Sequence, residues 1–262
     1  MALAYLSHPD CQLHDMGHHH PERPARLGAI NDRLLATGLD MALHHYNAPL
    51  VRRELLEAVH DPAYVERLFG IAPEEGLVWI DDDTAMAQHT LQAALRAAGA
   101  AVLAVDLVME GKASKAFCGV RPPGHHAEKG SAMGFCFFNN IAVAAYHALH
   151  SHGLQRVAIV YFDVHHGNGT EDIVANDERV LFCSTFQHPF YPHTGHACTA
   201  GNVVNVPLPA GTDGAGFRQA VEQSWLPRLE AFAPQLVLVS AGFDGHQADY
   251  MAQLNLVDDD YA

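Results

Sequence analysis

The sequence predicts an α/β fold with a mostly parallel central sheet. Four short segments are uniformly apolar rather than alternating, which is typical of strands buried on both faces of a parallel sheet. Longer Ala- and Leu-rich stretches lie between them, and an alternation of strands and helices favours a layered α/β architecture. The four predicted strands are Ala116–Val120, Arg156–Phe162, Val180–Ser184 and Gln235–Ala241.

Four helices are predicted around these strands. The first covers Pro24–Thr37, and the second, Thr84–Glu110, is long enough for one long helix or two short ones. The third, Asn139–His152, follows an asparagine, a residue that caps helix N-termini. The fourth covers Gly216–Phe232, and we expect Pro227 to kink or end it because proline lacks a backbone N–H.

The composition limits the class of protein. Of 262 residues, 49% are hydrophobic and 17% are charged, which supplies a sizeable core and excludes a disordered chain. Because no linker, repeat or low-complexity segment interrupts the sequence, we expect residues 1–262 to form a single domain. Thirty acidic residues against 15 Lys and Arg give a net charge of −15. This balance argues against nucleic acid as a partner and favours a cation.

Targeting signals and disulfides are not indicated. The five cysteines include no CxxC pair, and the N-terminus lacks the basic region of a signal peptide. The longest apolar stretch, AALRAAGAAVLAVDLVM, contains Arg96 and Asp106, so we expect no membrane span. We therefore expect a cytoplasmic protein with no membrane partner, and the oligomeric state stays open.

Polar, glycine-containing sequence follows three of the predicted strands. The strands run into RPPGHHAEKG, DVHHGNGT and SAGFDGHQAD. Ligands bind beyond the carboxyl ends of the strands in such sheets, and glycine lets the backbone turn tightly beside a ligand. The functional site is therefore expected at these three strand ends.

Asp163, His165 and Asp244 are the candidate metal ligands. Asp163 and His165 are two residues apart and project to the same side of an extended segment, and Asp244 follows the last predicted strand. One imidazole and two carboxylates with an open position are typical of catalytic zinc, although the same set accepts Fe(II), Co(II) or Mn(II). The alternative is that the two aspartates cap helices and His165 is a core histidine; the convergence of the strand ends favours the metal site.

His125 and His126 are the candidate acid/base pair. Next to a metal, one imidazole would take a proton from bound water while the other protonates a leaving amine. The alternative is an exposed pair of loop histidines. Pro122, Pro123 and Gly124 constrain this loop, which favours the functional interpretation.

At these residues the sequence resembles the histone deacetylase superfamily. That group includes histone deacetylases, bacterial deacetylase-like amidohydrolases, acetylpolyamine amidohydrolases and acetoin-utilisation proteins. The resemblance covers nearly the whole chain through HPERPARL, RPPGHHAEKGSAMGFCFFNNIAVAA, DVHHGNGTEDI and SAGFDGHQAD, in that order. It implies an arginase/deacetylase-type three-layer fold with the active site at the C-terminal strand ends.

The resemblance also implies residue roles. One zinc ion would be held by the three candidate ligands, and His125 and His126 would be the tandem catalytic pair. Phe135 and Tyr191 would wall a narrow acyl-lysine tunnel, and the Gly134 carbonyl would face the substrate amide. A structural potassium or other monovalent cation would bind near Asp163, His165 and Ser184, and Arg26 would lie by an inner acetate channel.

A single metal is favoured over two. The related ureohydrolases hold two manganese ions with DxHxD and DxD motifs. Here Gly167 and His246 stand where the additional aspartates would be.

Three features depart from the family pattern. Tyr161 stands where members have an aspartate that orients and charges one histidine of the pair, and this change is expected to reduce activity and disturb the cation site. Asn168, the other buried partner, resembles class II and bacterial deacetylase-like members. The chain ends at LNLVDDDYA, before the family's Gly-Gly-Tyr loop, whose tyrosine stabilises the oxyanion; we expect this C-terminal segment to be missing.

Together these features predict a zinc-dependent deacetylase acting on acetyl-lysine peptides or acetylpolyamines. The acidic segment Pro73–Asp83 would attract a cationic substrate if it lies at the tunnel mouth; otherwise it is a solvated loop. The alternative is a catalytically impaired relative that binds zinc and acyl-amines without efficient turnover, because of Tyr161 and the missing tyrosine. An acetoin-utilisation protein would differ from the first prediction in its substrate.

Overall fold

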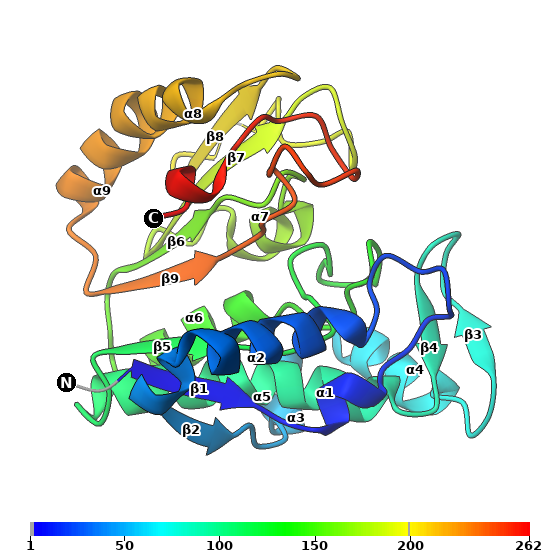
Figure 1. Cartoon of the computed structure of the whole chain (residues 1–262). Coiled ribbons are helices and arrows are strands. Elements are labelled where there is room, and N and C mark those ends of the chain that lie inside the picture. Colours follow the sequence, from blue (N-terminus) through cyan, green and yellow to red (C-terminus); the bar gives the residue numbers. More distant parts are fainter. Residues whose placement is uncertain (1–2, 199) are drawn as a thin grey trace. The chain divides into compact units, whose positions relative to one another are not determined.

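The computed structural model describes residues 3–198 and 200–262 and confirms an α/β fold with parallel strands (Figure 1). The chain divides into two compact units, residues 1–148 and residues 149–262. The expectation of a single domain stays a prediction.

The first unit contains a three-stranded parallel sheet in the order β2-β1-β5. The strands are β1 (Leu3–Ser7), β2 (Leu43–Asn47) and β5 (Lys115–Cys118). Helix α5 (Thr90–Met109) packs against this sheet, where Ala4 and Leu6 of β1 meet apolar residues of the helix. The remaining elements are α1 (Asp10–Leu13), α2 (Ala25–Thr37), η1 (Leu39–Ala42), α3 (Arg53–Glu57), α4 (Pro62–Ile71) and the antiparallel hairpin β3 (Leu77–Trp79) with β4 (Ala85–Ala87).

Helix α5 is a core helix. Within the part of the chain that the structure describes, it is the one helix long and apolar enough to cross a membrane, with a mean hydropathy of 1.6, yet half of its most apolar window is buried inside the fold. Gly99 lets its backbone approach the preceding segment, because a Cβ there would lie 1.9 Å from the Pro49 carbonyl oxygen. This close approach explains a glycine in a helix interior, where it otherwise costs about 1 kcal/mol relative to alanine.

The second unit contains a four-stranded parallel sheet in the order β8-β7-β6-β9. The strands are β6 (Val157–Tyr161), β7 (Val180–Gln187), β8 (Val203–Leu208) and β9 (Leu236–Ser240). One face carries a helical rod of α8 (Gly214–Ala220), η2 (Val221–Trp225) and α9 (Leu226–Phe232), seen in orange in Figure 1. Trp225 of this rod packs with Ala158 and Leu181 of the sheet. The other helical segments are α7 (Asn168–Val174) and η3 (Asp258–Asp260), and α6 (Asn140–Ser151) joins the two units.

All four predicted strands are present, and the helix predictions need two corrections. Residues 85–87 form β4, so the predicted helix Thr84–Glu110 begins only at Thr90. Pro227 was expected to kink or end the fourth helix; it does not end it, because the rod continues to Phe232, and it stands in the first turn of α9. A π-helical turn at Val221–Trp225 precedes this proline, so its missing N–H falls where the regular hydrogen-bond ladder is already interrupted.

The predicted cap of the third helix is confirmed. The side-chain oxygen of Asn139 accepts a hydrogen bond from the backbone N–H of Ala142 at 3.1 Å. This contact satisfies one of the free N–H groups in the first turn of α6.

Candidate active site

The three candidate metal ligands lie together at the C-terminal end of the second sheet. Asp163 and His165 follow β6, and Asp244 follows β9. These two strands pair in parallel, with Tyr161 opposite Ser240, so the segments that leave them emerge side by side. One ligand atom from each of the three side chains lies within 4.8 Å of the others.

Hydrogen bonds hold the two carboxylates around the imidazole. Nδ1 of His165 lies 2.9 Å from Oδ2 of Asp244 and 3.1 Å from Oδ1 of Asp163. The backbone N–H of Val164 donates to Asp244 at 3.0 Å, and that of His165 donates to Asp163 at 2.9 Å. Gly242 makes room for Asp163, since a Cβ on Gly242 would lie 2.1 Å from Oδ2 of that aspartate. The backbone therefore fixes both carboxylates before any cation binds.

The electrostatics of this cluster favour a positive charge. Burial lowers the pKa of His165, but the hydrogen bonds and negative charges of Asp163 and Asp244 outweigh burial and raise the pKa to about 10. Two carboxylates facing one imidazole thus stabilise a cation at this point. A divalent metal fits the same donor set, because carboxylate oxygen and imidazole nitrogen are ordinary zinc ligands.

The surroundings of Ser184 test whether this residue fits the predicted monovalent cation site. It lies on β7, opposite Tyr161 of β6, and is fully buried. Its hydroxyl oxygen has no hydrogen-bond partner within residues 3–198 and 200–262. A buried hydroxyl oxygen without a partner is costly, and ligation of a cation would satisfy it. The residue therefore fits the predicted ion.

Tyr161 is fully buried at the end of β6. Its ring fits there because position 167 is a glycine: a Cβ on Gly167 would lie 2.9 Å from Cε2 of the tyrosine. Asn168, the first residue of α7, is also buried, and its backbone N–H donates to the His166 carbonyl at 2.9 Å. The second unit thus has room for the Tyr161 ring because its neighbour Gly167 has no side chain.

The predicted acid/base pair lies in the first unit. The imidazole rings of His125 and His126 are 3.9 Å apart between centroids, with an interplanar angle of 34°. His126 is buried and His125 is partly exposed. Both imidazoles therefore lie side by side in this loop, as a tandem acid/base pair requires.

Gly134 and Phe135 form a tight turn against this pair. Both have positive φ angles, 55° for Gly134 and 69° for Phe135. A Cβ on Gly134 would lie 2.4 Å from Cδ2 of His126, so a glycine is required there. The turn is tied to the β3–β4 hairpin because the backbone N–H of Phe135 donates to the hydroxyl oxygen of Thr84 at 3.0 Å. Sequence reasoning missed Thr84 because it placed that residue at the start of a helix.

Tyr191 lies in the second unit near the candidate metal ligands. Its ring centroid is 6.0 Å from that of His165, at an interplanar angle of 78°. Phe190, which sequence reasoning did not single out, stacks on His165 with centroids 5.3 Å apart. Its position directly before Tyr191 in HPFYPHTG is the sequence feature that could have identified Phe190.

Arg26 is on α2, where its side chain is 54% exposed and Nη1 lies 3.1 Å from Oε1 of Glu22. Glu22 is buried and accepts hydrogen bonds from Arg121, which leads into the RPPGHH loop. The N-terminal HPERPARL motif is thus connected to the loop that carries the histidine pair. The position of Arg26 beside an acetate channel stays a prediction.

A family model described as "Histone deacetylase domain" matches residues 20–262. The chain belongs to the histone deacetylase family. An uncharacterized protein of Synechocystis is 41% identical over 254 residues, covering 95% of this chain and 83% of that protein. A probable deacetylase of Archaeoglobus fulgidus is 37% identical, covering 100% of this chain and 74% of that protein. A crystal structure of the HDA15 HD domain matches with a TM-score of 0.94 and 33% identity, covering 99% of this chain and 78% of that one.

Membership of the histone deacetylase family confirms the resemblance and the fold class predicted from sequence. It also supports deacetylase activity, a hydrolysis of amides, in general terms. The individual site residues stay predictions, to which the structure adds the geometry given above.

Proposed function

We propose that this chain is a zinc-dependent deacetylase that hydrolyses the acetamide of acetyl-lysine or of other acetylated amines. The observation that supports it best is the cluster of Asp163, His165 and Asp244, whose ligand atoms lie within 4.8 Å of one another. Three protein ligands leave a coordination position for water or substrate, as catalytic zinc requires. A bound zinc ion would polarise the acetamide carbonyl and make the attacking water more acidic.

The chain's own residues supply the rest of the chemistry. The backbone N–H groups of Val164 and His165 hold the carboxylates of Asp244 and Asp163 in fixed orientations. In the proposal, one imidazole of the His125–His126 pair takes the proton of the attacking water and the other protonates the leaving amine. Phe135 and Tyr191 are proposed to pack against the aliphatic stem of the substrate and to exclude water from the amide.

A monovalent cation, potassium in the first instance, is proposed as a structural ion near Asp163, His165 and Ser184. The buried hydroxyl oxygen of Ser184 supports this assignment. The ion would have a structural role and take no part in bond breaking.

The test is turnover of a fluorogenic acetyl-lysine substrate by the zinc-loaded chain. We expect activity that a chelator removes, that zinc restores and that a hydroxamate blocks. Asp244→Asn is expected to abolish it, whereas Glu230→Gln, which removes one exposed carboxylate on α9, leaves it intact. A protein that folds but binds no zinc would exclude this function.

A catalytically impaired relative is the second candidate, and Tyr161 favours it. A buried phenol at this position cannot carry the negative charge of a carboxylate at neutral pH. This candidate predicts about one zinc per chain and binding of acyl-amines or a hydroxamate, with no measurable turnover of acetyl-lysine peptides or acetylpolyamines. The turnover assay therefore separates the two candidates, although zinc content does not. A cytoplasmic location is proposed for both.

A further inference from the structure

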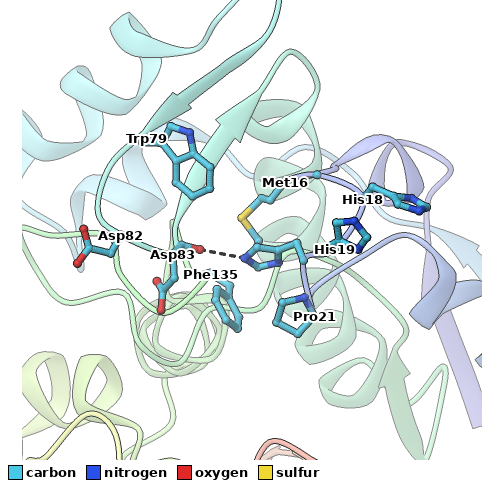
Figure 2. Close-up of a pocket in the computed structure, with 10 residues that line it drawn as sticks. Met16, His18, His19, Pro21, Trp79, Asp82, Asp83 and Phe135 are labelled. Atoms are coloured by element: carbon cyan, nitrogen blue, oxygen red, sulfur yellow. Dashed lines mark hydrogen bonds between the residues drawn. The ribbon is translucent and has the colours of Figure 1, made fainter.

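A cavity of about 380 Å³ lies in the first unit, next to the proposed tunnel residue Phe135. Figure 2 shows its two sides: one is formed by the β3–β4 hairpin and the other by residues 16–21, with Phe135 between them. The residues that line it are Met16, Gly17, His18, His19, His20, Pro21, Trp79, Asp82, Asp83 and Phe135.

The hairpin side of this cavity combines carboxylates with an exposed aromatic ring. Trp79 at the end of β3 is 55% exposed and lines this side of the cavity. Asp82 and Asp83 follow at the tip of the hairpin, and no Lys or Arg is among the lining residues. Burial and the neighbouring Asp81 raise the pKa of Asp83, although the hydroxyl of Thr84 lowers it, so a positive charge nearby would stabilise its ionised form.

The hairpin tip is held in one conformation. The backbone N–H of Ile80 donates to the Thr84 carbonyl at 2.8 Å, and the carboxylate of Asp81 accepts from the N–H groups of Asp83 and Thr84 at 3.0 and 2.6 Å. The hydroxyl of Thr84 donates to the carboxylate of Asp83 at 3.0 Å and accepts from Phe135. The acidic tip and the tunnel residue are thus parts of one hydrogen-bonded structure.

His20 closes the cavity between the hairpin and Phe135. Its Nδ1 lies 3.0 Å from the backbone nitrogen and 3.1 Å from the carbonyl oxygen of Glu22, and its Nε2 lies 3.0 Å from the Asp83 carbonyl oxygen. The edge of this ring also packs on Phe135, with centroids 4.6 Å apart.

We infer that this cavity is a recognition site for an alkylammonium group of the substrate, separate from the acetylated amine that is hydrolysed. The inference rests on the proposed deacetylase function and adds a substrate preference to it. The carboxylates of Asp82 and Asp83 supply negative charge that complements the ammonium group. The rings of Trp79 and Phe135 supply cation–π contact and pack against the methylene groups of the alkyl chain. The ammonium group comes either from a lysine near the acetyl-lysine of a peptide or from a free amine of an acetylated polyamine.

Paired substrates test this inference by steady-state kinetics. One peptide carries lysine beside the acetyl-lysine and its partner carries norleucine; a monoacetylated triamine is paired with an acetylated alkylamine of the same length. We expect kcat/KM to be higher for the charged member of at least one pair, which identifies the source of the ammonium group. Trp79→Leu and Asp82→Asn are expected to reduce that preference by roughly fivefold each.

Glu75→Gln is the matched control. It removes one carboxylate from the same acidic segment at an exposed position that does not line the cavity. Retention of the preference in this variant excludes a general effect of net charge. Equal preference in the wild type, Trp79→Leu and Asp82→Asn overturns the inference but leaves the proposed function intact, since turnover itself is still observed.

A binding measurement keeps the inference testable if no substrate is turned over. The chain contains two tryptophans, and Trp225 is buried in the second unit. In a Trp225→Phe variant, the fluorescence of Trp79 therefore reports directly on the cavity. We expect a saturable change with spermidine and none with a neutral diol of similar length; the absence of a saturable change with spermidine overturns the inference.

Discussion

Gly134 packs its backbone directly against the imidazole ring of His126, so closely that a Cβ at position 134 would lie 2.4 Å from Cδ2 of the ring. The glycine also has a φ of 55°, a conformation that residues with a side chain rarely adopt. One glycine therefore serves two purposes in the proposed site: it forms the turn that carries Phe135, and it lets that turn contact the histidine pair.

Gly134→Ala is expected to reduce kcat/KM for an acetyl-lysine substrate by roughly 10–100-fold, because the new methyl group displaces the His126 ring from its position. Gly111→Ala is the control that distinguishes the clash with His126 from the strain of placing alanine at a positive φ. Gly111 has a similar φ of 70° but no atom within 4 Å of a built Cβ. Steady-state kinetics and thermal melts of both variants check the prediction, and it is wrong if Gly111→Ala loses as much activity as Gly134→Ala.

The cluster of Asp163, His165 and Asp244 predicts that zinc stabilises the protein. A ligand at 100 times its Kd stabilises the folded state by about 2.7 kcal/mol, so the melting temperature is expected to rise by several degrees on addition of zinc. Asp244→Asn is expected to remove most of this rise, since it removes one ligand charge and weakens the Asp244–His165 contact.

Differential scanning calorimetry with and without zinc makes this measurement. Glu230→Gln on α9 is the control and is expected to retain the full shift. An equal zinc shift in Asp244→Asn and the wild type would contradict the assignment of the ligand.

Glu22 predicts how the first unit responds to acid. Burial alone would raise its pKa, but hydrogen bonds from His14 and Arg121, together with their charges, lower it from 4.5 to about 2. A carboxyl group whose pKa is lower in the folded state stabilises the fold above its unfolded pKa. This stabilisation, about 3 kcal/mol, is lost as the pH falls from 4.5 towards 2.

Urea unfolding of metal-free protein between pH 5.5 and pH 3 measures this effect. The unfolding free energy of the wild type is expected to fall more steeply than that of Glu22→Gln, which has no carboxyl group to titrate. Glu75→Gln, at an exposed position, is expected to follow the wild type. Parallel curves for Glu22→Gln and the wild type would show that Glu22 does not carry the acid sensitivity.

Tyr161→Asp is expected to raise the rate of deacetylation by roughly tenfold or more, because it restores the carboxylate that the family resemblance places beside one catalytic histidine. It is also expected to destabilise the protein by about 3 kcal/mol, since it removes a fully buried aromatic ring and leaves a cavity in its place. Kinetics below the melting temperature of the variant measure the gain. Tyr161→Phe, which keeps the ring and adds no carboxylate, is the control and is expected to show no gain in rate. The prediction is wrong if the Tyr161→Asp protein folds but deacetylates no faster than the wild type.

Much of the second sheet could be predicted from the sequence. Uniformly apolar runs identified β6, β7 and β9. Burial on both faces explains the pattern for the central strand β7, which is buried along its whole length. It does not explain β9, the edge strand, where Val237 and Val239 are 48% and 53% exposed. By contrast, β2 reads LHHYN and is only partly buried, and it is not among the four predicted strands. Such a strand has too weak an apolar pattern to be distinguished from a loop, and pairing with β1 decides its structure.

The sequence by itself determined the α/β class and the residues expected to bind a metal, because local hydrophobic pattern and motif order along the chain are sufficient for both. Only the tertiary structure decided how Thr84 is used, how Tyr161 fits, and that Trp79, Asp82 and Asp83 border a cavity with residues 16–21. These features depend on contacts between segments far apart in the chain: Thr84 meets Phe135 across 51 positions, and His20 meets Asp83 across 63. No periodicity within one segment encodes such contacts, since they arise only when the packed fold brings the segments together.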